Sequence, residues 1–292
     1  MLGYSTGAAL ALDFALDAMT GDAKPVPASL ILISPAIRVS NAAALASFQD
    51  SLSVLPGMDR MAWLDLLPEY DPYKYNSFAT NAADVVHRLT TGVDGRIAKR
   101  VRANKGFILP PTLVFKSAVD ATVTTEAVVD NLLTLLPPYR HELVLYDINR
   151  SAVSSALLKD NSGPLTTRLM KDKSLPFTVT FISNESPETS ALVARHKQPF
   201  TVEPEKPQAL DTNWPADVLS LSHIALSFPP NDPLYGRYPP EDDNFIYLGQ
   251  IALRSERGLH RLPADLLLRM RYNPFYQSLE NKLFNWLEST NG

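Results

Sequence analysis

The first residues of the chain contain a serine in a setting that can make it a nucleophile. The pentapeptide at residues 3–7, Gly-Tyr-Ser-Thr-Gly, has the pattern G-x-S-x-G, and an apolar run typical of a helix follows directly at residues 8–16. On a sharp strand-to-helix turn such a serine exposes its Oγ, and the flanking glycines leave room for the backbone to fold back. The helix N-terminus behind it offers unpaired N–H groups to a developing negative charge. The pattern therefore predicts acyl-transfer chemistry at Ser5, with a simple turn serine as the alternative.

A serine nucleophile needs a neighbouring base, and the base needs a carboxylate that orients it. Asp120 stands just past an apolar run at residues 112–117, and His223 follows another short run at residues 217–222. Because ligand and catalytic residues gather at the carboxyl ends of parallel strands, we expect both side chains to lie near Ser5. Two alternatives stay open: Asp120 could cap a helix, and His223 could be a partly buried polar residue.

Four other histidines compete with His223 for the role of base. His87 lies in a predicted helix, His141 precedes a strand instead of following it, and His196 and His260 lie beside polar or charged residues. The position after a predicted strand therefore favours His223.

Strands and helices alternate in the first half of the chain. Apolar, partly β-branched runs predict buried strands at residues 29–34, 112–117 and 142–146. Amphipathic runs predict helices at residues 8–20 and 124–136. Such an alternation with short links indicates an α/β protein with a mostly parallel sheet.

The remaining segments are less regular. We expect helices at residues 58–67 and 82–89, a strand at 176–182, a polar surface loop at 196–213, and a C-terminal helix at 274–287. The apolar residues of the first of these helices are predicted to belong to the core or to line an acyl pocket.

Three segments resemble parts of the α/β-hydrolase superfamily, in particular its lysophospholipase and monoglyceride-lipase branch. Residues 3–7 resemble the nucleophile elbow, residues 117–123 the acid turn, and residues 214–223 the histidine loop. The resemblance covers most of residues 1–150 and the segment around His223. It implies an α/β-hydrolase fold with a helical cap and a serine hydrolase that cleaves carboxylic esters with an apolar acyl or alcohol part. Its implied residues are a Ser5, His223 and Asp120 triad and one oxyanion donor, the N–H of Thr6. No cofactor or metal is expected.

The resemblance also suggests a domain plan. Residues 1–38 and 109–292 would form the hydrolase core, residues 39–108 a helical cap, and residues 151–210 a second insertion within the core. Only two residues precede the elbow, so the N-terminal strands of the family have no counterpart in this sequence. We therefore expect a C-terminal fragment that is nearly inactive and poorly soluble alone, unless an oligomer or a second chain covers the exposed sheet edge. The alternative function is a hydrolase-like pseudoenzyme that binds a partner or ligand without turnover.

Composition narrows the class of protein. The chain has 292 residues, a net charge of −4 and no cysteine. The acidic balance argues against a nucleic-acid partner, and the missing cysteines exclude disulfides, thiolate metal sites and a cysteine nucleophile. No apolar run is long enough for a transmembrane helix. We expect a soluble protein with a small ester or lipid-like substrate; a cytoplasmic location is favoured, and a periplasmic one stays open if a longer N-terminus exists.

Overall fold

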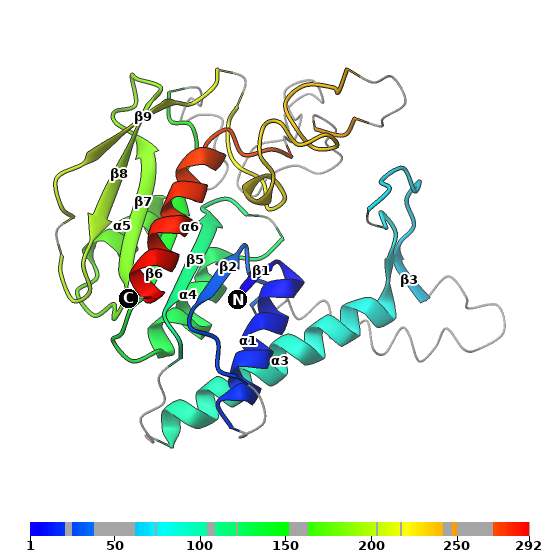
Figure 1. Cartoon of the computed structure of the whole chain (residues 1–292), viewed down its shortest axis with the longest axis vertical. Helices are drawn as coiled ribbons and strands as arrows, with labels where there is room; N and C mark the ends of the chain where they lie inside the picture. The colour runs from blue at the N-terminus through cyan, green and yellow to red at the C-terminus, as the bar shows by residue number, and fades with distance from the viewer. Residues whose placement is uncertain are drawn as a thin grey trace.

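A computed structural model of the chain describes residues 1–20, 25–37, 62–73, 75–103, 109–120, 122–151, 163–202, 204–216, 218–241, 247–249 and 271–291. Within these ranges the molecule is an α/β protein arranged around one large sheet (Figure 1).

The large sheet has seven strands in the order β1-β2-β5-β6-β7-β8-β9. The strands are β1 (Leu2–Tyr4), β2 (Leu30–Ile33), β5 (Thr112–Ser117), β6 (His141–Tyr146), β7 (Thr178–Asn184), β8 (Ala191–Lys197) and β9 (Gln208–Asn213). The first five run parallel, whereas β8 and β9 are antiparallel to their neighbours. The predicted α/β class with a mostly parallel sheet is therefore confirmed.

Helices cover both faces of this sheet. The helices are α1 (Thr6–Ala18), α3 (Thr80–Arg102), α4 (Thr125–Asn131), α5 (Gly163–Lys171) and α6 (Tyr276–Asn291), with short 3-10 helices η3 (Leu133–Leu135) and η5 (Ala225–Ser227). One core cluster joins α1, α3, α4 and α5 to one face, and a second joins α6 to the other. Figure 1 shows α6 lying across the strands, on the side away from α4.

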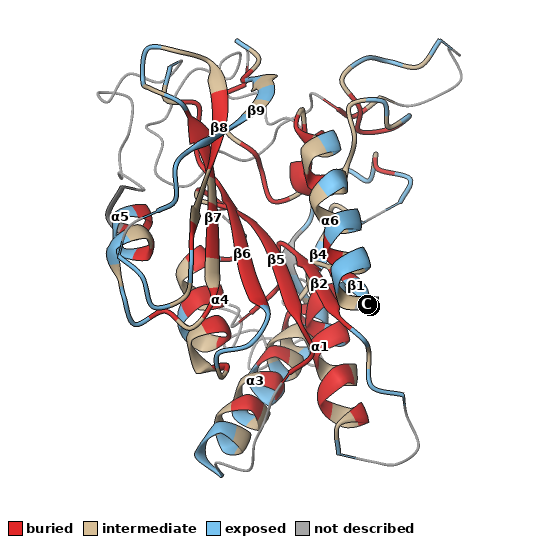
Figure 2. Ribbon diagram, turned by 60° about the vertical axis from the view of Figure 1, so that its left-hand side comes forward, coloured by how far each residue is buried: buried red, intermediate tan, exposed pale blue. Residues whose placement is uncertain are grey.

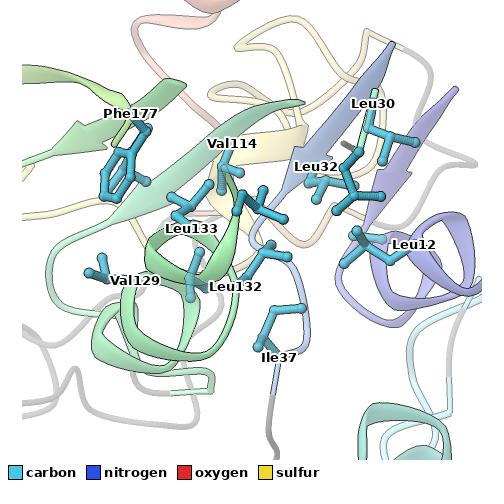
Figure 3. Close-up of a cluster of buried hydrophobic side chains, with 14 of the residues drawn as sticks. Leu12, Leu30, Leu32, Ile37, Val114, Val129, Leu132, Leu133 and Phe177 are labelled. Atoms are coloured by element: carbon cyan, nitrogen blue, oxygen red, sulfur yellow. The ribbon is translucent and has the colours of Figure 1, made fainter. Parts of the chain in front are cut away.

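The two clusters exist because the central strands are apolar on both sides. Successive side chains of a strand point to opposite faces, so β2 places Leu30 and Leu32 in the first cluster and Ile31 and Ile33 in the second. The central strands are accordingly buried along their length (Figure 2). Figure 3 shows part of the first cluster, where Leu12 of α1 and side chains of the α4 region meet the strands.

Two predicted elements in the first half of the chain differ in the structure. Residues 63–65 form β3 (Trp63–Asp65), which pairs with β4 (Phe78–Ala79), instead of continuing a helix over residues 58–67. Trp63 is 43% exposed and Leu66 57%, so these residues do not bury the apolar face that would stabilise a helix. Residues 58–61 lie outside the described ranges. The helix predicted at residues 82–89 extends over the whole of α3, because Val93 and Ile97 also enter the core.

The second half of the chain needs larger corrections. Residues 208–213, predicted to be loop, form the edge strand β9, whose polar side chains are mostly exposed. The strand predicted at residues 217–222 is absent from its described part, residues 218–222, which is irregular. The helix predicted at residues 124–136 is interrupted at Leu132, which separates α4 from η3. The described part of residues 151–210 contains α5, β7 and β8, and these two strands belong to the large sheet.

Helix α3 lies against α1 instead of standing apart from the core. Arg96 forms ion pairs with Asp13 and Asp17, and Arg100 donates a hydrogen bond to the carbonyl of Leu16. In the described part of the chain, no helix combines the length and apolarity that a membrane span requires.

We predict that the apolar side of the α6 region is a main source of stability. The ring of Phe275 is buried, meets Trp214 edge-on at 4.7 Å between centroids, and stacks on Tyr146 at 6.4 Å. Phe275→Ala should lower the free energy of unfolding in urea by about 3–5 kcal/mol, because it leaves a cavity. Phe284→Ala is the matched control on α6, where the side chain is 54% exposed, and it should change stability by less than about 0.5 kcal/mol. Equal losses would show that α6 is not held through this face.

Candidate active site

Ser5 occupies a strained turn between β1 and α1. Its φ is 52° and its ψ is −119°, a backbone conformation that residues with a side chain rarely adopt. Hydrogen bonds fix it: its N–H donates to the carbonyl of Ile33 at 2.9 Å, and its carbonyl accepts from Ala8 at 3.1 Å and Ala36 at 3.0 Å. Although Ser5 is the N-cap residue of α1, its hydroxyl makes no capping hydrogen bond. The turn therefore leaves Oγ available to another partner.

The glycines on either side of Ser5 have different roles. A Cβ on Gly3 would lie 2.5 Å from the carbonyl oxygen of Gly7 and 2.6 Å from the Cα of Ala8, so the strand and the first turn of the helix meet there with no space between them. A Cβ on Gly7 would meet nothing within 4 Å. The close approach thus requires glycine at position 3 alone.

The structure brings Ser5, His223 and Asp120 together in one hydrogen-bonded row. His223 Nε2 lies 2.9 Å from Ser5 Oγ, and His223 Nδ1 lies 2.8 Å from Asp120 Oδ2. His223 is 4% exposed, and the ring of Tyr4 lies 5.5 Å from its imidazole between centroids. A base between a hydroxyl and a carboxylate, with one ring nitrogen toward each, is the arrangement that activates a serine.

Asp120 follows β5 and is not the cap of the next helix. The N-cap of α4 is Thr124, whose Oγ1 accepts a hydrogen bond from the N–H of Ala127 at 3.3 Å. Asp120 Oδ1 instead accepts from the N–H groups of Thr122 at 2.8 Å and Val123 at 3.1 Å. The helix-cap interpretation of Asp120 is therefore wrong.

Lys116 is a member of this site that the sequence reasoning missed. It lies on β5, is completely buried, and contacts Asp120 Oδ2 through its ammonium group, which also donates to the carbonyl of Val123 at 2.7 Å. Burial would raise the pKa of the Asp120 carboxyl, but the hydrogen bond from His223 and the charge of Lys116 outweigh it and hold that pKa well below its ordinary value. The sequence does contain a signal for Lys116: it is a charged residue within the otherwise uncharged, mostly apolar run at residues 112–117.

The loop that carries His223 is held by polar residues at the ends of two central strands. Asn149, which follows β6, donates from its backbone N–H to Leu219 at 2.8 Å and from its side chain to the carbonyl of Val218 at 2.9 Å. Ser34, which follows β2 and has a φ of 44°, donates a long hydrogen bond of 3.4 Å to the carbonyl of His223. Asn149 was also missed, although a polar residue just past a buried strand is a recognisable signal.

Beyond His223, the chain is anchored to the segment that precedes α3. Tyr235 donates its hydroxyl to the buried carboxylate of Asp71, whose two oxygens lie 2.7 and 2.9 Å away, and Arg271 reaches the same carboxylate at 3.1 Å. The ring of Phe228 lies 4.5 Å from that of Tyr235 between centroids. These contacts fix the course of the chain after the histidine loop.

The other described histidines lie away from Ser5. His87 is on α3, His141 is at the first residue of β6, and His196 is on β8, where its Nδ1 lies 2.9 Å from Thr180 Oγ1. His260 lies outside the described residues.

Thr6, predicted to supply an oxyanion donor, is the first residue of α1. No described residue accepts a hydrogen bond from its N–H. This amide lies beside Ser5, at the positive end of the helix dipole.

Within the described ranges the side chains form no metal site. No group of three or more histidine, aspartate or glutamate side chains is placed to hold a metal ion within the described ranges. A cavity of about 640 Å³ lies between strands β5–β9 and α6, and its lining residues include none of Ser5, Asp120 and His223.

No protein-family model matches this chain, and no curated protein matches it. One crystal structure, of a protein from Agrobacterium vitis S4 named provisionally as a hydrolase, is similar over 49% of this chain and 50% of that one, with 21% identity and a TM-score of 0.28. The chain thus spans about half the length of that structure. A likeness this weak shows nothing about the function of this chain.

The two glycines give a sharp test of the turn. Gly3→Ala should destabilise the fold by about 3 kcal/mol, the upper end for overpacking, because the new Cβ meets backbone atoms that cannot rotate away. Gly7→Ala should leave stability unchanged or raise it by about 0.4–1 kcal/mol, since the site is open and the unfolded chain loses freedom. Urea unfolding measures both. Similar effects of the two variants would contradict the close approach at Gly3.

Proposed function

We propose that the protein is a serine hydrolase that cleaves carboxylic esters with an apolar acyl or alcohol part. The observation that carries the proposal is the row of hydrogen bonds from Ser5 through His223 to Asp120, at 2.9 and 2.8 Å, with the serine on a strained strand-to-helix turn. Strain of this kind is stored at functional sites, where the surrounding structure maintains it. The resemblance of residues 3–7, 117–123 and 214–223 to the α/β hydrolases suggests the ester class.

The proposed reaction assigns one task to each side chain. Ser5 Oγ attacks the ester carbonyl while His223 Nε2 takes its proton, and the same nitrogen then returns that proton to the leaving alcohol. Asp120 accepts the Nδ1–H of His223, which sets the tautomer and stabilises the imidazolium. The N–H of Thr6 donates to the oxyanion. Water then attacks the acyl-enzyme, His223 takes its proton, and the acid and free Ser5 are released.

The charge of the acid fits this scheme. Because the pKa of Asp120 lies well below its ordinary value, its side chain is a carboxylate throughout the neutral pH range. Asp120 is therefore already ionised when His223 takes the proton of Ser5, and its own protonation state does not have to change.

We also propose that part of residues 39–108 forms a cap that restricts the substrate. The contact of Asp71 with Tyr235 and Arg271 supports this, because it joins the segment before α3 to the chain after His223. The second half of α3 is assigned to the core instead, because Val93 and Ile97 pack in the same cluster as Leu12.

The competing proposal is a pseudoenzyme that binds without turnover. Turnover of an ester by the full chain decides between the two.

Hydrolysis of p-nitrophenyl esters by the full chain tests the proposal. Ser5→Ala should lower kcat roughly a million-fold, and His223→Ala added to Ser5→Ala should lower it little further, because residues of one catalytic unit are strongly non-additive. Tyr235→Phe, which removes a hydroxyl bound to Asp71 and not to the triad, is the control and should retain kcat within about tenfold. A Ser5→Ala variant within tenfold of the wild type would overturn the assignment. A folded wild type with no turnover would favour the pseudoenzyme.

A further inference from the structure

Lys116 is an unusual residue for the interior of a sheet. It belongs to β5, where Leu113, Val114 and Phe115 are completely buried, and its own side chain is 0% exposed. A buried ammonium is costly unless an anion and hydrogen bonds compensate it. The anion is Asp120, and the Lys116 ammonium group donates hydrogen bonds to Asp120 Oδ2 and to the carbonyl of Val123.

The Asp120 carboxylate is saturated with donors. Oδ1 accepts from the amides of Thr122 and Val123, and Oδ2 is shared by Lys116 and His223. A carboxylate offers about four lone-pair sites, so these contacts fix its plane as well as its charge. Lys116 and His223 contact the same oxygen. When the imidazole gains a proton, its positive charge therefore lies close to that of the Lys116 ammonium group.

Other described groups also face this row. Glu126 on α4 attracts Lys116, whose pKa is lowered by burial while Asp120 and Glu126 oppose that shift. Tyr4 on β1 contributes a ring beside His223, and Ser5 contributes its hydroxyl. Asp120 and Lys116 are the charged side chains in the hydrogen-bonded row next to the imidazole.

We propose that Lys116 is a positioning residue of the site: its cation holds the Asp120 carboxylate toward His223 and places a positive charge beside the position where the imidazole takes up the Ser5 proton. The inference rests on the proposed function. Electrostatically, a carboxylate alone stabilises an imidazolium, whereas a carboxylate already neutralised by an ammonium does so much less. Lys116 thereby tunes the pH range of the reaction without touching substrate.

The test compares pH profiles of kcat/KM for an ester substrate. In Lys116→Met the acid limb should move up by about one pH unit, because loss of a neighbouring like charge favours the imidazolium. Lys116→Arg keeps the cation and should restore the limb to within about 0.3 pH units of the wild type, well under that one-unit effect. Thr125→Val is the matched control, since it removes an uncharged buried hydrogen bond of 3.0 Å to Ser117 at the end of the same strand, and it should leave the limb in place.

A second measurement separates this inference from the proposed function. The protonation midpoint of the His223 ring, followed by NMR and identified by its loss in His223→Gln, does not depend on turnover. A midpoint that rises in Lys116→Met supports the charge role of Lys116 even if no ester is cleaved, in which case only the proposed function fails. An active enzyme whose acid limb and midpoint both stay unchanged in Lys116→Met overturns the inference.

If Lys116→Met does not fold, the inference is tested by comparing the stability of Asp120→Asn with that of the double variant Asp120→Asn/Lys116→Met. Asp120→Asn leaves the Lys116 cation buried without its anion, so adding Lys116→Met to that variant should raise the urea midpoint. An unchanged or lower midpoint in the double variant would show that Lys116 is not held as a cation by Asp120.

Discussion

The backbone of Ser5 is the constraint on which the site depends. A φ of 52° in a residue with a side chain is unfavourable, and it persists because Ile33, Ala8 and Ala36 each make a backbone hydrogen bond to Ser5. These partners come from the end of β2, the first turn of α1 and the chain after β2. The turn therefore exists only when β1 is paired with β2 and α1 is packed on the sheet. The fold in this way orients the Ser5 hydroxyl toward His223.

A buried carboxylate links that turn to the rest of the sheet. Asp120 receives donors from its own turn, from Lys116 on β5 and from His223, and Asn149 after β6 holds the loop on which His223 lies. The site is thus assembled from the ends of adjacent parallel strands, where such folds gather their functional groups. The sequence predicted a strand at residues 217–222, just before His223. The structure instead holds this irregular segment and His223 through hydrogen bonds from Asn149 and Ser34.

Much of this arrangement could be predicted from local patterns. The apolar runs of β2, β5 and β6 are buried on both faces, so composition alone marks them as central strands, and the glycine-flanked Ser5 precedes an apolar helix. Asp120 was placed correctly after β5, although its role as a helix cap had to be excluded by the structure.

The parts that could not be predicted depend on contacts between distant residues. The edge strand β9 exposes polar side chains and therefore looks like a loop in sequence. The Lys116 side chain is buried only because Asp120 and Val123 compensate it, a pairing that follows from the turn and not from periodicity. Residues 63–65 pair as a strand because Phe78 and Ala79 lie beside them, which no local pattern near Trp63 reveals.

The central claim is that Ser5 is an activated nucleophile, and covalent labelling tests it most directly. The full chain would be treated with a fluorophosphonate, and its intact mass and peptides would be measured. The account predicts one adduct per chain, on the peptide that contains Ser5, with no adduct in His223→Gln over the same time because the base is lost. A folded protein that stays unmodified, or that carries its adduct on another residue, would contradict the account.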